Sequence, residues 1–95
     1  MKISPTFINM AQKELLERIC IRADMDTGVA EFLSNELFDI DDKSSRRRFM
    51  YIALQGVKNG LWTASYSHKD EQGLQTCKFK PLIRIVSYVH NKVEI

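Results

Sequence analysis

The sequence predicts a small α+β domain with three helices, a β-hairpin and a C-terminal helix. Two observations predict this class. Apolar residues recur at helical spacing from the N-terminus to the Asn-Gly pair at 59–60. Beyond that pair, short runs of alternating apolar and polar residues flank a glycine-containing loop, which is typical of a hairpin. The 95 residues suffice for one core, so we expect a single domain over 1–95.

The first helix is predicted to begin at Ser4 as N-cap, with Pro5 in its first turn, and to end near Arg22. Its apolar stripe is Phe7, Ala11, Leu15 and Ile19, with Ile8, Leu16 and Cys20 beside it. A stripe repeating every four residues is typical of a helix that buries one face.

A second helix is predicted over residues 28–37, after a polar turn at 23–28. Asp26 or Thr27 is suited to cap it. Its expected core-facing residues are Val29, Phe32, Leu33 and Leu37.

The third helix, residues 44–59, raises the central question of the sequence. Asp41, Asp42 or Ser44 is suited to cap it, and the Asn-Gly pair to end it. Its broad apolar face comprises Phe49, Met50, Ile52, Ala53, Leu54 and Val57, and its narrow polar stripe Ser44, Arg47, Arg48, Tyr51, Gln55 and Lys58. Arg46 alone points into the apolar arc. Three arginines occupy the first turns, although that end of a helix disfavours cations.

The hairpin is predicted from residues 61–68 and 74–80, with the loop between them. Trp62, Ala64 and Tyr66 share one face of the first strand, and Cys77 and Phe79 alternate with polar residues on the second.

The tail, residues 81–95, is predicted to form a helix that Pro81 starts, although its many β-branched residues also favour a strand. Its apolar stripe is Leu82, Ile85, Val86, Val89 and Val93. Because a small domain can fill its core without this stripe, we expect the tail to hold a homodimer. The alternative is that the stripe folds back onto its own monomer.

The periodic apolar positions also predict the core. Its expected members are Phe7, Leu15, Ile19, Val29, Phe32, Leu33, Phe49, Ile52, Ala53, Val57 and Trp62.

The two halves of the chain differ in charge. Residues 1–42 hold four basic and nine acidic side chains, whereas residues 43–95 hold ten basic and three acidic ones. No acid lies between Lys43 and Lys69. This split predicts a basic face with an anionic partner, unless the halves interleave in space and their charges mix.

Three helices followed by a hairpin resemble the winged helix-turn-helix DNA-binding domain. The resemblance covers residues 5–80 and rests on 28–37 as second helix, 41–60 as recognition helix and 67–73 as wing. It implies a sequence-specific transcriptional regulator, for instance a repressor, whose third helix lies in the major groove of double-stranded DNA. Two features depart from the family: residues 38–43 are long for the turn and lack glycine, and the wing carries Asp70 and Glu71.

The resemblance to the winged helix-turn-helix domain predicts DNA contacts from the third helix and the wing. The candidate residues are Lys43, Ser44, Ser45, Arg46, Arg47, Arg48, Tyr51, Gln55, Lys58, His68 and Lys69. An arginine fork matches a guanine edge or a phosphate, and Lys58 suits a phosphate. The alternative is that these residues form a solvated cationic face that binds no ligand and only aids solubility.

Motifs for catalysis and metal binding are absent from the sequence. His68 and His90 have no partner at metal-ligand spacing, and the serines form no nucleophile motif, so we expect no enzyme, metal or cofactor. No apolar run is long enough for a membrane span, and no signal peptide is evident. Cys20 and Cys77 are expected to be reduced thiols in a cytoplasmic protein.

A competing function is a protein-binding module. Such a domain inhibits or recruits a larger protein through its acidic N-terminal half, or pairs its arginines with an acidic partner. DNA binding weakens steeply with salt, which distinguishes the two classes.

Overall fold

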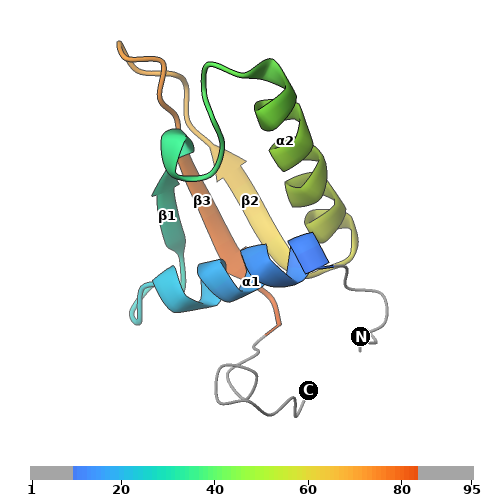
Figure 1. The fold of residues 1–95 in the computed structure, drawn as a ribbon. Coiled ribbons are helices and arrows are strands. Elements are labelled where there is room, and N and C mark those ends of the chain that lie inside the picture. Colours follow the sequence, from blue (N-terminus) through green and yellow to red (C-terminus); the bar gives the residue numbers. More distant parts are fainter. Residues whose placement is uncertain (1–9, 84–95) are drawn as a thin grey trace.

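The computed structural model describes residues 10–83. Along the chain lie helix α1 (Met10–Arg22), strand β1 (Ala30–Leu33), the 3-10 turn η2 (Ser34–Glu36), helix α2 (Lys43–Lys58) and strands β2 (Trp62–Tyr66) and β3 (Thr76–Pro81). The strands form one antiparallel sheet in the order β1-β3-β2. Helix α1 crosses the sheet near one end, and α2 runs along β2 (Figure 1). This arrangement confirms the α+β class. No helix within residues 10–83 is long and apolar enough to cross a bilayer.

Both α-helices match their predicted limits wherever the structure describes them. Helix α1 ends at Arg22 and buries Leu15, Leu16 and Ile19. Its predicted start at Ser4 lies outside the described residues. Helix α2 begins after Asp42, whose side chain accepts the Ser44 backbone N–H at 2.9 Å. It ends at the Asn-Gly pair, where Gly60 adopts φ of 74°.

The predicted second helix is wrong. Residues 30–33 form strand β1, and only residues 34–36 make a short 3-10 turn. The turn before them is held by Asp24, which accepts the N–H groups of Asp26 and Thr27, so neither residue caps a helix. Pairing with β3 turns Ala30 and Phe32 inward and leaves Leu33 exposed. A short apolar run is compatible with both the helical and the alternating period, and here pairing with β3 makes it a strand.

The hairpin is confirmed. Strand β2 pairs with β3 in the register Ala64 opposite Phe79, and Cys77 and Phe79 face the helices. Pro81 is the last residue of β3 and does not start a helix. The Leu82 N–H after it donates to the carbonyl of Leu61, which extends the pairing with the β2 side of the sheet. Residues 84–95 lie outside the described part of the chain, so the C-terminal helix and its role in a homodimer stay predictions.

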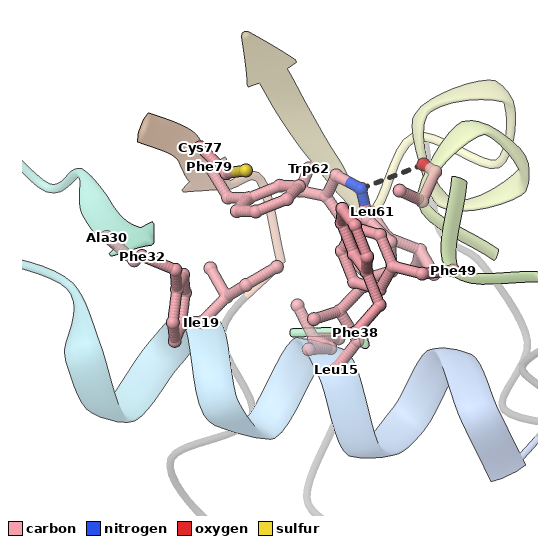
Figure 2. Close-up of a cluster of buried hydrophobic side chains, with 12 residues drawn as sticks. Leu15, Ile19, Ala30, Phe32, Phe38, Phe49, Leu61, Trp62, Cys77 and Phe79 are labelled. Atoms are coloured by element: carbon pink, nitrogen blue, oxygen red, sulfur yellow. Dashed lines mark hydrogen bonds between the residues drawn. The ribbon is translucent and has the colours of Figure 1, made fainter. Parts of the chain in front are cut away.

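Phe79 is the centre of the core. Its side chain is fully buried, and its ring contacts the rings of Phe32, Phe49, Trp62 and Tyr66 at centroid distances of 6.1–6.5 Å. Figure 2 shows Phe79 with Phe32, Phe49 and Trp62 above α1. The other buried apolar residues within 10–83 are Leu15, Leu16, Ile19, Ala30, Phe38, Ala53, Leu61 and Cys77.

The predicted core is partly right. Leu15, Ile19, Phe32, Phe49, Ala53 and Trp62 are buried. Val29 and Ile52 are only half-buried, and Phe7 lies outside the described residues. Leu33 and Val57 are exposed, which contradicts their prediction. Leu33 was placed in the core because a helical period was applied to what is a strand. Val57 was placed there because the buried face of α2 is narrower than the apolar face of its sequence.

A polar clamp joins α1 to β1 and η2. The Arg22 guanidinium donates to the Glu31 carbonyl at 2.9 Å and to the Glu36 carboxylate at 3.0 Å, and lies 4.5 Å from the Phe32 ring centroid. Arg18 donates to the Glu36 carbonyl. The other oxygen of the Glu36 carboxylate accepts the Leu33 N–H at 2.8 Å. The clamp therefore holds the 3-10 turn against α1.

The Glu36 clamp is expected to give stability a pH dependence. The Leu33 N–H and then Arg22 lower the pKa of Glu36 from its ordinary value of 4.5. A carboxyl with a lowered folded pKa contributes stability above its unfolded pKa and loses it as pH falls through the folded value. Glu36→Gln should thus reduce the free energy of unfolding at neutral pH, and the difference from the parent should shrink on acidification below about 4.5.

Urea titrations of parent and variant at several pH values measure this effect. Glu71→Gln is the matched control, since the exposed Glu71 side chain makes no hydrogen bond or ion pair within residues 10–83. A Glu36→Gln variant that differs from the parent by the same amount at all pH values would contradict the electrostatic role.

Candidate nucleic-acid interface

The close packing of α2 on β2 determines which face of α2 meets solvent. Gly56 faces Trp62 so closely that a Cβ at this position would lie 1.9 Å from the indole ring. The Trp62 indole N–H also donates to the Ala53 carbonyl at 3.0 Å (Figure 2). The buried residues of α2 are only Phe49, Ala53 and Gly56. Met50 and Ile52 are half-buried against the core, and the opposite side of the helix faces solvent.

The exposed face of α2 is cationic and also carries apolar side chains. Arg47, Arg48 and Lys58 are exposed, and Lys43–Lys58 contains no acidic residue. Tyr51 is 64% exposed, Leu54 50% and Val57 40%. Val57 was predicted in the core and Leu54 on the apolar face of the helix, but both are exposed and lie on the same side of the narrow face formed by Phe49, Ala53 and Gly56. The solvent face is thus broader and more apolar than predicted.

The cations of this face have no carboxylate partner in the described part of the chain. Within residues 10–83 the single salt bridge joins Arg22 and Glu36. Acids that neighbour α2 in sequence serve the backbone instead: Asp42 caps α2, and Asp39 accepts the Asp41 N–H. The positive charge of α2 is therefore not neutralised by any carboxylate among residues 10–83, which favours an anionic ligand.

The loop between β2 and β3, residues 67–75, is anchored at its base and shaped at its tip. The Ser34 hydroxyl accepts the Gln75 N–H at 3.0 Å, and the Gln75 side-chain amide donates to the Ser67 carbonyl. At the tip, the Asp70 carboxylate accepts the N–H groups of Gln72 and Leu74. Asp70 thus shapes the loop, which explains one of the two acids at the predicted wing.

The structure distributes the predicted site residues over one helix and one loop. Exposed are Lys43, Ser44, Arg46, Arg47, Arg48, Tyr51, Lys58, His68 and Lys69, whereas Ser45 and Gln55 are half-buried. The start of α2 and the β2–β3 loop lie at the same end of the molecule (Figure 1). There Arg46 and Lys69 line one hollow. Lys58 lies apart from them, because eleven residues of helix from Arg47 give a rise of roughly 17 Å.

Two candidate residues have structural partners. The Ser45 hydroxyl accepts the Asp39 N–H at 3.0 Å and so holds the loop before α2. That loop is long and lacks glycine, but Phe38 anchors it in the core. The carbonyl of His68 accepts the Ser67 hydroxyl, which fixes the backbone at the start of the wing.

The two oppositely charged halves of the chain interleave in the sheet but not on α2. Glu31 of the acidic half lies opposite Lys78 of the basic half in the register of β1 and β3, on the sheet face away from the helices. Charges therefore mix on that face. Helix α2 itself contains no acidic residue, so its exposed face stays cationic.

Sequence reasoning missed Ser34, Gly73 and Gln75, which form the base and wall beside Arg46 and Lys69. The glycine in a predicted hairpin loop was the available signal. Ser34 gave none, because it was assigned to a helix.

Comparisons with known proteins return no relative. The chain matches no family model, no curated protein and no solved structure.

Proposed function

We propose that the protein binds double-stranded DNA in a sequence-specific manner, with α2 in the major groove. The observation that carries this proposal is the exposed face of α2, whose arginines have no carboxylate partner within residues 10–83. Helix α2 leading into the β2–β3 hairpin keeps the part of the winged helix-turn-helix resemblance that recognises DNA. The helix expected before it is replaced by β1 and η2.

The chemistry of the face suits a duplex. The major groove admits one helix and presents guanine O6 and N7 as acceptors. Arg47 and Arg48 offer planar forks that match this edge or a phosphate. Tyr51 and Ser44 supply hydroxyl groups, and the exposed apolar carbons of α2 suit the methyl group of thymine. Lys58, far from the arginines, suits a backbone phosphate. The cost of arginines at the helix start is offset when they contact this anion.

Removing Arg47 and Arg48 together should abolish specific binding. Each alanine substitution alone should weaken it by ~1–3 kcal/mol where the side chain reads a guanine, and relax the preference there. Fluorescence anisotropy with a duplex selected from random sequence measures the loss. Lys78→Ala/Lys80→Ala is the matched control, because it removes the same charge from the opposite sheet face.

Lys58→Ala should instead weaken binding to all sequences equally and flatten the salt dependence by about one unit. Unchanged affinity of the folded Arg47→Ala/Arg48→Ala variant, or an equal loss in the sheet-face control, would contradict recognition by α2.

A regulatory role follows from this proposal. A small domain with one recognition helix gains affinity as a homodimer, since twofold symmetry presents two helices to a palindromic site. We therefore propose a dimeric transcriptional regulator in the cytoplasm.

A second candidate function is supported by the apolar part of the same face. Tyr51, Leu54 and Val57 recur every three residues and form an exposed strip beside Arg47 and Lys58. This pattern suits an acidic amphipathic segment of another protein. Affinity for such a partner should fall modestly with salt, whereas affinity for DNA should fall steeply.

A further inference from the structure

A small hollow lies where η2, the start of α2 and the β2–β3 loop meet. It has a volume of about 20 Å³. Phe38 and the buried Ser34 line its interior side, Gly73 and Gln75 belong to the loop, and the exposed Arg46 and Lys69 flank it. The hollow therefore joins three segments that are distant in sequence.

The two cations have no anionic partner in the part of the chain that the structure describes. Neither Arg46 nor Lys69 makes an ion pair within residues 10–83. Like charges that share a site repel each other, and an anion between them removes this cost. The acids of the loop do not supply that anion: Asp70 bonds the loop backbone, and neither Asp70 nor Glu71 lines the hollow.

The walls of the hollow are held in place without a ligand. The Ser34 N–H donates to the Gln75 carbonyl at 2.9 Å, and the Gln75 N–H donates to the Ser34 side-chain hydroxyl at 3.0 Å. The Phe38 N–H donates to the Ser34 carbonyl. A cationic side chain on a backbone that is already held in place loses less conformational entropy on binding than one on a free loop.

The size of the hollow limits which part of a ligand can enter it. A space of about 20 Å³ holds one water-sized atom, so it accepts a single oxygen and not a base or a sugar. An oxyanion such as phosphate can project one oxygen into this space while its remaining oxygens stay outside, and phosphate is the oxyanion that a DNA backbone presents. Arg46 and Lys69 both bind phosphate oxygens well.

We propose that Arg46 and Lys69 hold one phosphate group between them, with one of its oxygens in this hollow. In the DNA complex that group is a single backbone phosphodiester, so this step rests on the proposed function. The contact gives Arg46, which points away from the stripe of Arg47, a task distinct from base reading. It also couples the β2–β3 loop to α2 through the ligand.

The test uses the full chain and duplexes in which single phosphates are replaced, one at a time, by uncharged methylphosphonate. In the parent, one position (or its symmetry mate) should lower affinity roughly tenfold, as expected for a charged hydrogen-bonded contact. Arg46→Gln and Lys69→Gln should each lower affinity for the unmodified duplex by a similar factor and lose sensitivity at that same position. The double variant should bind about as the single ones do. Lys80→Gln is the charge-matched control and should keep the parent profile.

A second arm uses inorganic phosphate and the backbone amide signals of Gly73 and Gln75 in NMR spectra. Shifts of these signals that Arg46→Gln and Lys69→Gln both abolish support the phosphate site even when no duplex binds, in which case only the proposed function fails. If duplexes bind but the two variants lose sensitivity at different phosphates, or their effects simply add, the shared site is overturned while DNA binding stands. If duplexes bind but neither their binding nor the phosphate-induced shifts respond to the two substitutions, the shared site is overturned while DNA binding stands. If no duplex binds and inorganic phosphate shifts neither amide signal, both proposals are overturned.

Discussion

Replacing Phe79 by alanine is expected to unfold the domain or bring it to the edge of unfolding. The side chain is fully buried and contacts four other aromatic rings from β1, α2 and β2. Removing a buried phenylalanine costs ~3–5 kcal/mol, through lost burial and the cavity left behind. A domain of this size has a free energy of unfolding near the lower end of the usual ~5–15 kcal/mol. Among residues 10–83 the Phe49 ring contacts two other rings, those of Phe38 and Phe79, so Phe49→Ala should cost less than Phe79→Ala.

Urea denaturation followed by tryptophan fluorescence measures the change, because Trp62 packs against Phe79. Phe79→Leu retains most of the volume and keeps the experiment informative if the alanine variant does not fold. Its cost should be intermediate. Lys78→Ala, on the neighbouring exposed position of β3, should stay within about 0.5 kcal/mol of the parent. A folded Phe79→Ala variant with unchanged stability would contradict the core described above.

Gly56→Ala is expected to be the second large effect, and its sign is opposite to that of an ordinary helix substitution. In an exposed helix, replacing glycine by alanine stabilises by about 1 kcal/mol. Here the added Cβ would lie 1.9 Å from the Trp62 ring, which is fully buried and hydrogen-bonded to Ala53. The indole cannot move without breaking that bond and shifting Phe79. We expect a net loss of about 2–3 kcal/mol, the upper part of the usual range for overpacking.

The close approach itself is tested by a double-mutant cycle. Trp62→Leu alone should destabilise strongly, but adding Gly56→Ala to it should cost little or stabilise, because the ring is gone. Thermal denaturation of the four proteins gives the coupling free energy. Equal effects of Gly56→Ala in both backgrounds would show that the indole does not limit this position.

The β1 region shows why sequence alone was insufficient for part of the fold. Residues 28–37 contain apolar side chains at both helical and alternating spacing. The hydrogen bonds that make residues 30–33 a strand go to β3, more than forty residues later. Local sequence propensity carries no information about pairing with a strand that lies so far along the chain. The same limit hid the hollow at Ser34, because its members come from three separate segments.

The sequence by itself determined the elements whose signals are local. The apolar stripe of α1, the Asp42 cap and Asn-Gly end of α2, and the Gly-containing loop of the hairpin each act within a few residues, so their positions followed from the chain. It also determined that α2 carries arginines without acids. Tertiary structure alone decided how much of the apolar side of α2 is exposed, because the contact between Gly56 and Trp62 sets how the helix is rotated on the sheet. That contact places Leu54 and Val57 in solvent, and long-range packing brings Arg46 and Lys69 to one hollow.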